Sequence, residues 1–74
     1  MKLDLHGVKH ADVYPTVDKF IWNSMLNRVH QVEIVTGKSS DMIKIVTSCL
    51  SDYNMEPRIN EIVGVMYVDI DPLF

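Results

Sequence analysis

The chain has 74 residues and a formal net charge of −3, and 47% of its residues are hydrophobic. A chain this short fits one domain, residues 1–74, with a thin core, because it buries only about 60% of the surface that it exposes when unfolded. No apolar run approaches the ~20 residues that cross a bilayer, and the lone Cys49 excludes an internal disulfide, so we expect a cytoplasmic protein with no membrane partner.

The first predicted element is a strand over residues 2–6. Polar and apolar residues alternate there, which turns the two leucines toward the core and Asp4 and His6 toward the opposite face. Gly7 follows and ends the strand.

A first helix is predicted next, with Asp12 as its N-cap. Pro15 then falls in the first turn, where the missing N–H of proline costs nothing. Apolar residues recur at helical spacing and form the predicted buried stripe: Val13, Val17, Phe20, Ile21 and Met25. The helix should end at Asn27 or Arg28.

A second strand and a second helix follow. The strand covers Val32–Thr36 and is stopped by Gly37, and Ser39 or Ser40 caps the helix, with Asp41 in its first turn. The predicted inward face of this helix consists of Met42, Val46, Cys49, Leu50 and Tyr53.

In the last part of the chain, polar and apolar residues alternate with a period of two. This pattern predicts strands over Arg58–Ile62 and Val65–Ile70, joined by a tight hairpin across Val63-Gly64. The resulting order, β-α-β-α-β-β, predicts an α/β fold of the α+β two-layer sandwich type, with a four-stranded mixed sheet and both helices on one face.

This topology brings two distant segments together. If the first two strands are parallel, their carboxyl ends share one edge of the sheet, and ligands of open α/β sheets bind at such ends. His6-Gly7 and the segment from Thr36 to Ser39 would then be neighbours.

Asp4 and His6 are the candidate catalytic residues. They lie two apart on a strand and so emerge on the same face. A carboxylate beside an imidazole fixes its tautomer and supports general acid or base chemistry near neutral pH. The alternative is that both residues are only the solvent side of a half-buried strand.

The segment Thr36–Ser40 is the candidate phosphate cradle. It runs into a helix N-terminus, where backbone N–H groups, the helix dipole and the Lys38 ammonium favour an anion. An ordinary serine-capped turn is the alternative interpretation. A P-loop is excluded, because Val32 stands five residues before Gly37, where a P-loop has glycine. Lys9, His10 and Lys44 are candidates for a basic patch around the same edge.

The strings Leu3-Asp4-Leu5-His6-Gly7 and Thr36-Gly37-Lys38, at this separation, resemble the two motifs of the Smr (small MutS-related) domain family. The resemblance covers nearly the whole chain. It implies a fold similar to the C-terminal domain of translation initiation factor three, nucleic-acid binding and, in many members, endonuclease activity on DNA or RNA. It also matches Asp4 and His6 to the pair associated with activity, and Thr36, Gly37 and Lys38 to the glycine-rich turn.

Two departures from the family pattern support an alternative function. Ser39 stands where the motif has its second glycine, so a side chain limits the approach of a phosphate and restricts φ. The loop before the last strand is also reduced to a hairpin turn. Together with the acidic balance, these features favour a non-catalytic module that docks on a protein or ribonucleoprotein.

The resemblance and the two neighbouring motifs predict a nucleic-acid-binding domain with endonuclease activity on RNA or DNA, and the non-catalytic docking module is the alternative. The predicted substrate-binding residues are Gly7, Lys9, His10, Thr36, Gly37, Lys38, Ser39 and Ser40. RNA cleavage through its 2′-hydroxyl needs no cofactor, whereas DNA cleavage calls for a divalent metal at Asp4. No zinc site is predicted, because Cys49 is alone and no histidines have paired ligand spacing.

Overall fold

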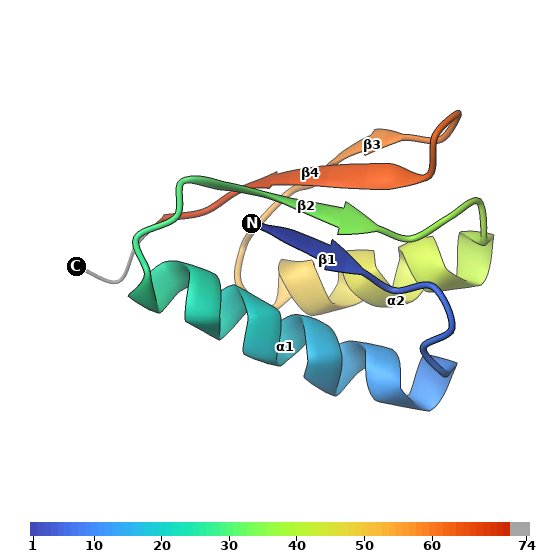
Figure 1. Ribbon diagram of the computed structural model, residues 1–74, viewed down its shortest axis with the longest axis horizontal. Helices are drawn as coiled ribbons and strands as arrows, with labels where there is room; N and C mark the ends of the chain where they lie inside the picture. Colours follow the sequence, from blue (N-terminus) through green and yellow to red (C-terminus); the bar gives the residue numbers. More distant parts are fainter. Residues whose placement is uncertain (72–74) are drawn as a thin grey trace.

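Four strands form one mixed sheet, and two helices lie side by side across one of its faces (Figure 1). The computed structural model describes residues 1–71. In chain order the elements are β1 (Lys2–Asp4), α1 (His10–Leu26), β2 (Gln31–Val35), α2 (Ser40–Ser51), β3 (Arg58–Asn60) and β4 (Val65–Asp69). The strand order is β1-β2-β4-β3, with β1 parallel to β2 and the other pairs antiparallel. The predicted fold class is confirmed.

The core lies between the helices and the covered face of the sheet. On β2, Val32 and Ile34 are fully buried and their neighbours Glu33 and Val35 are partly exposed, as an alternating strand requires. The remaining buried hydrophobic residues are Leu5, Val13, Val17, Ile21, Met42, Val46, Cys49, Leu50, Met66, Val68 and Ile70. The two predicted helix stripes are confirmed in their buried centres, while Phe20, Met25 and Tyr53 pack against the core only partly buried. No helix in the described part of the chain is long and apolar enough to cross a membrane.

The start of α1 differs from the prediction. The helix begins at His10, and its N-cap is the extended Lys9, which makes no side-chain capping bond. Asp12 lies in the first turn instead of at the cap, and Pro15 lies in the second turn. The helix starts early because Val8, which packs against the core, closes a turn on Leu5 through its N–H (3.1 Å) and directs the chain straight into α1.

The strands β1 and β3 are shorter than predicted. β1 ends at Asp4, because the chain turns through Gly7 at a φ of +78°, although Leu5 N–H still donates to the Val35 carbonyl at 3.0 Å. β3 ends at Asn60, so the hairpin has a four-residue turn, residues 61–64, instead of the predicted two-residue turn. The Asn60 carbonyl closes this turn by accepting from Gly64 N–H at 2.9 Å.

Replacing Ile34 tests how much of the stability rests on the central strand. Ile34 is fully buried on β2, between β1 and β4. We expect Ile34→Ala to lower the free energy of unfolding by about 2–5 kcal/mol, because it removes buried surface and leaves a cavity. Ile34→Val should cost about 0.5–1.5 kcal/mol. Urea unfolding followed by circular dichroism measures both, and equal losses would contradict a closely packed site.

Candidate functional site

Three turns meet at one edge of the sheet, on the right of Figure 1. They connect β1 to α1, β2 to α2 and β3 to β4. β1 and β2 are parallel and therefore end together, and β4 is antiparallel to β2 and starts where β2 ends, with Val35 opposite Val65. The predicted meeting of the Asp4–His6 strand end with the Thr36-Gly37 turn is confirmed, and the β3–β4 hairpin joins them.

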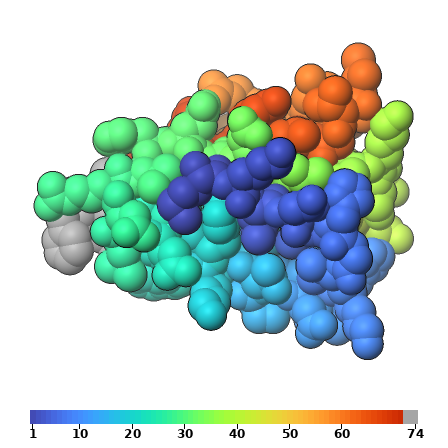
Figure 2. Space-filling view, in the orientation of Figure 1, coloured from blue at the N-terminus to red at the C-terminus, as the bar shows by residue number. Residues whose placement is uncertain are grey.

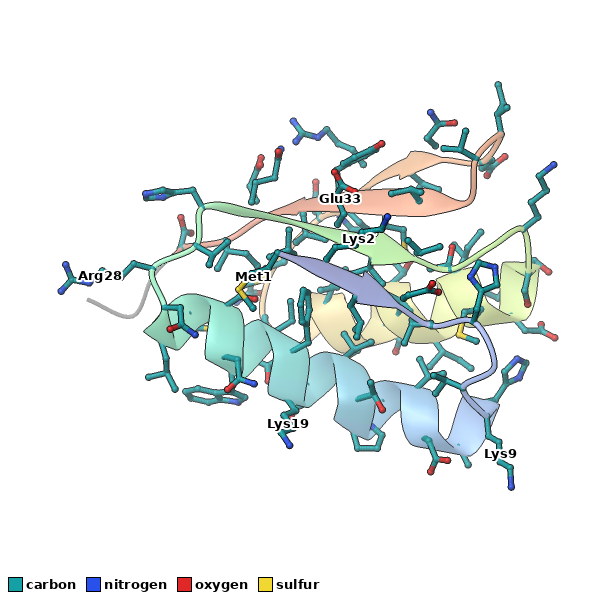
Figure 3. All side chains as sticks on the ribbon, viewed as in Figure 1. Met1, Lys2, Lys9, Lys19, Arg28 and Glu33 are labelled. Carbon is teal, nitrogen blue, oxygen red and sulfur yellow. The ribbon has the colours of Figure 1, made fainter. Side chains whose placement is uncertain are left out.

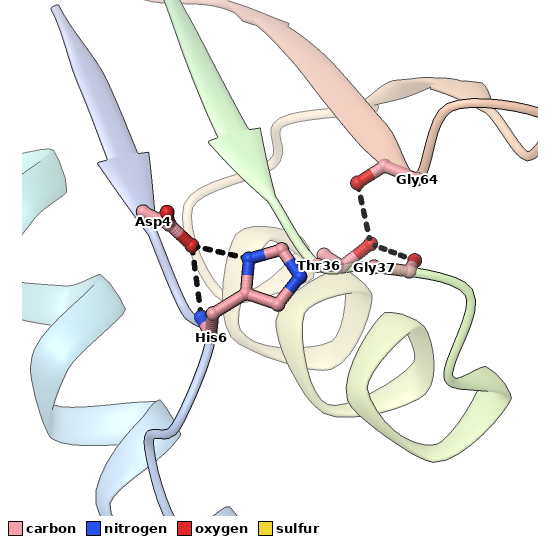
Figure 4. Close-up of polar contacts among 5 residues, drawn as sticks. All are labelled: Asp4, His6, Thr36, Gly37 and Gly64. Atoms are coloured by element: carbon pink, nitrogen blue, oxygen red, sulfur yellow. Dashed lines mark hydrogen bonds and ion pairs between the residues drawn. The ribbon is translucent and has the colours of Figure 1, made fainter.

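Asp4 and His6 are in direct contact (Figure 4). One carboxylate oxygen of Asp4, Oδ1, accepts from the backbone N–H of His6 at 2.9 Å and from its ring Nδ1 at 2.7 Å. These bonds lower the pKa of Asp4, the backbone bond most and the ring bond next, so the carboxylate is ionised at neutral pH. An ionised Asp4 selects the tautomer with the proton on Nδ1, which leaves the lone pair of neutral His6 on Nε2.

The free ring nitrogen of His6 faces the turn that follows β2. Gly37 has a φ of +70°, and a Cβ added there would lie 3.6 Å from Nε2 of His6. Because glycine has no side chain, the approach to Nε2 from this side stays open. The side chains of His6 and Asp4 are 69% and 61% exposed, so a large substrate can reach the pair from solvent.

Gly64 joins the hairpin to the β2–α2 turn. Its carbonyl oxygen accepts from the N–H of Thr36 at 2.9 Å and from the N–H of Gly37 at 3.0 Å. The Thr36 hydroxyl donates at 2.9 Å to the Gly37 carbonyl, and the Gly64 carbonyl lies 3.3 Å from the same hydroxyl (Figure 4). A Cβ at Gly64 would lie 2.6 Å from the Gly37 carbonyl carbon, so only glycine allows this approach.

Sequence reasoning missed the role of Gly64 and treated it only as a turn residue. The antiparallel pairing of β4 with β2 is the signal that could have shown it, because Val35 lies opposite Val65 and the glycines that follow and precede these residues then lie side by side. The contact also removes one donor from the predicted phosphate cradle, because the Gly37 N–H is already bonded to the Gly64 carbonyl.

Ser39 is the N-cap of α2, as one of the two predicted alternatives. Its Oγ accepts from the Met42 N–H at 3.3 Å. Its φ of −73° is ordinary for serine, so the expected restriction on φ at this position is wrong. Within residues 1–71, the N–H groups of Lys38 to Asp41 have no protein acceptor, which leaves them to solvent or to an anion.

The predicted basic residues lie on separate segments. Lys9 and His10 are exposed at the start of α1, and Lys9 points away from the sheet (Figure 3). Lys38 is exposed in the β2–α2 turn, next to the cradle amides. Lys44 is exposed on the second turn of α2. Of these cations, Lys38 is the one that belongs to the turn facing His6.

The described residues contain no cluster of three or more histidine, cysteine or carboxylate side chains that could hold a metal ion. Asp4 is the carboxylate that belongs to the candidate site. Cys49 is completely buried in the core, and its desolvation raises the pKa of its thiol, so it is not a reactive nucleophile.

Comparison with known families gives one result. The family model described as the Smr domain matches residues 3–70 of the 74-residue chain. Neither the curated proteins nor the solved structures include a significant match. The matched range contains the Asp4–His6 pair, the Thr36-Gly37 turn and Gly64.

The pKa of Asp4 tests the geometry of the pair. In the wild-type protein it should lie below the ordinary value of 3.8. In His6→Ala the ring bond is lost but the backbone N–H remains, so the pKa should rise and still stay below 3.8. Because folding lowers the pKa of Asp4, its ionised carboxylate stabilises the folded state at any pH above the pKa of the unfolded chain. This stabilisation is lost as the pH falls through the lowered pKa of the folded state. Carboxyl-carbon NMR titration measures it, and a wild-type value of 3.8 or higher would refute the contact.

Two glycine variants separate backbone strain from close approach. Gly7 and Gly64 both have positive φ, but a Cβ at Gly7 would meet nothing within 4 Å. We expect Gly7→Ala to cost about 1–2 kcal/mol through the left-handed backbone alone. Gly64→Ala should cost clearly more and shift the NMR signals of Thr36 and Gly37. If urea unfolding gave the same loss of unfolding free energy for Gly7→Ala and Gly64→Ala, the backbone of Gly64 would not lie tightly against Gly37.

Proposed function

The chain belongs to the Smr domain family, which is nuclease-related and whose members bind nucleic acids or proteins, and from this premise we propose that it is an endonuclease acting on RNA. The observation that carries the proposal is the contact of Asp4 with His6, which holds the ring and leaves Nε2 as a free base on an open edge. General base catalysis requires such a group within reach of the proton that it removes.

In the proposed reaction, Nε2 of His6 removes the proton from a 2′-hydroxyl of RNA. The 2′-oxygen attacks the adjacent phosphorus, and the bond from phosphorus to the 5′-oxygen breaks. The products are a 2′,3′-cyclic phosphate and a 5′-hydroxyl end, the latter taking its proton from solvent, and His6 releases its own proton to solvent. Asp4 orients the ring and stabilises the imidazolium that forms.

The β2–α2 turn is the proposed phosphate-binding part of the site. Lys38 and the unbonded N–H groups at the start of α2 would stabilise the charge that builds up on the phosphate oxygens. Gly37 contributes by leaving space beside Nε2, since its own N–H is bonded to Gly64. Thr36 supports the turn through the same Gly64 contact. Gly7 provides the turn after β1, and Lys9 and His10 would meet more distant phosphates.

RNA suits these groups better than DNA. DNA has no 2′-hydroxyl, so a water molecule would have to attack, and a divalent metal at Asp4 would be the natural activator. Asp4 is a single carboxylate, and the described residues offer no cluster of three or more ligands that would hold the metal beside it. The RNA route uses the Asp4–His6 contact as it stands.

The test compares RNA cleavage by the wild-type protein with that by two histidine variants. We expect His6→Ala to lower the rate by about 10²–10⁴-fold, the usual worth of a general base. His30→Ala is the matched control, because His30 is also exposed but lies just before β2, at the opposite end of that strand. Labelled single-stranded RNA and supercoiled plasmid are each incubated with and without EDTA.

The products and the substrate chemistry sharpen this test. A strand with a single 2′-deoxy nucleotide at the mapped cleavage position should resist cleavage there, and the intact RNA should yield cyclic phosphate ends in the presence of EDTA. Equal cleavage by His6→Ala and the wild type would refute the role of His6. Loss of RNA cleavage in EDTA would favour the metal route through Asp4.

A non-catalytic docking module for a protein or ribonucleoprotein is the second candidate. It is favoured by the net charge of −3 and by the engagement of the Gly37 N–H with Gly64, both of which weaken phosphate binding. A salt titration of RNA binding by fluorescence anisotropy separates the two functions. Binding that strengthens as salt falls supports the nuclease, and no binding at low ionic strength supports a protein partner.

A further inference from the structure

The tip of the β3–β4 hairpin exposes two neighbouring aliphatic side chains. Ile62 is 82% exposed, more than any other large hydrophobic residue in residues 1–71, and Val63 is 55% exposed. Exposed apolar residues are common when they are scattered singly, but a pair at the end of a hairpin forms a small apolar surface. We call Ile62 and Val63 the aliphatic tip.

The aliphatic tip is held by hydrogen bonds on both sides. The Asn60 side chain accepts from the Ile62 N–H at 3.2 Å, and the Asn60 carbonyl accepts from the Gly64 N–H at 2.9 Å. The Gly64 carbonyl is in turn bonded to Thr36 and Gly37. The hairpin therefore presents the pair at a fixed position, which lowers the conformational entropy that a contact with a ligand would cost.

The tip lies close to the candidate site. Gly64 packs against Gly37, and Gly37 faces Nε2 of His6. Ile62 precedes Gly64 by two residues, so their Cα atoms lie within roughly 7 Å of each other. Figure 2 shows the hairpin (orange) at the same end of the molecule as the turn around residues 38–40 (yellow-green). A nucleotide whose phosphate lies at His6 would therefore have its base, or the next base, within reach of the tip.

The charges of this edge argue against recognition of a duplex. Asp4 is ionised at neutral pH, Asp41 lies in the first turn of α2 and Glu61 precedes the tip. The segments that meet at this edge therefore carry more carboxylates than the one ammonium of Lys38 balances. Duplex binding depends largely on cations that neutralise phosphates. An unpaired strand also exposes the faces of its bases, and contacts to these faces do not depend on neutralising phosphates.

We propose that the aliphatic tip contacts an unpaired base next to the bond that is cut, so that the substrate is single-stranded RNA. This inference rests on the proposed nuclease function and adds the strandedness of its substrate. In several nucleic-acid complexes, aliphatic side chains insert between the stacked bases of a duplex, at the cost of unstacking them. Unpaired bases can be splayed out, so the exposed Ile62 and Val63 would reach their faces without that cost.

Binding measurements on three probes test the proposal. The probes are a labelled single strand of 2′-O-methyl RNA, which lacks the 2′-hydroxyl proton and stays intact, the same strand annealed to its complement, and an abasic strand with the same number of phosphates. The double variant I62S/V63S should bind the single strand about tenfold more weakly than the wild type does. It should bind the duplex and the abasic strand as the wild type does, because the lost contact is to bases.

Two control variants complete the experiment. Leu26→Ser also removes an exposed aliphatic residue, 56% exposed, but at the far end of α1, and should leave binding unchanged. Lys38→Ala should reduce the slope of binding against salt, whereas I62S/V63S should leave this slope unchanged. Urea unfolding confirms that each variant is folded.

Each outcome has one meaning. Unchanged binding of the single strand by I62S/V63S, or an equal loss on the abasic strand, overturns the role of the tip while RNA cleavage by the wild type still stands. A wild-type protein that binds none of the probes at low salt and cleaves no RNA overturns the nuclease function and the tip with it.

Discussion

The carbonyl oxygen of Gly64 accepts from the backbone N–H groups of Thr36 and Gly37, at a position where a Cβ would lie 2.6 Å from the neighbouring backbone. This contact joins the last hairpin to the end of β2, and the end of β2 lies beside the His6 ring through Gly37. The geometry of the whole edge therefore depends on two backbone segments that touch without side chains between them. A core this thin cannot fix such an edge by burial alone, and the hydrogen bonds supply the missing constraint.

The two halves of the candidate site are built in different ways. The Asp4–His6 contact is local, since Asp4 is the last residue of β1 and one oxygen of its carboxylate accepts from both the backbone N–H and the ring of His6 in the turn that follows. The same oxygen fixes the tautomer of the ring. The proposed phosphate-binding side is made by backbone groups from β2, α2 and the hairpin, which come together only in the folded chain. The Asp4–His6 pair can thus be arranged at the end of one short exposed strand, whereas the proposed cradle depends on the complete sheet.

This difference explains what the sequence could predict. Alternation and helical spacing were enough for the fold class, for the covered face of the sheet and for the meeting of the β1 and β2 ends, because each follows from a period or a topological rule. Prediction was wrong at Asp12 and Pro15, where the packing of Val8 decided the start of α1 instead of a capping side chain. The role of Gly64 could not be derived from its neighbours in sequence, because its partner lies 27 residues away at Gly37.

The four-residue turn between Asn60 and Val65 also determines where the sequence of such a domain can change during evolution. Gly64 is fixed to the end of β2, but residues 61–63 precede that contact and are exposed. Substitutions at residues 61–63 can therefore change the exposed surface of this edge while the residues around His6 keep their arrangement. Under the proposed function, one glycine separates the residues that select a substrate from those that act on it, and a library that varies residues 61–63 between Asn60 and Gly64 would sample new specificities on an unchanged scaffold.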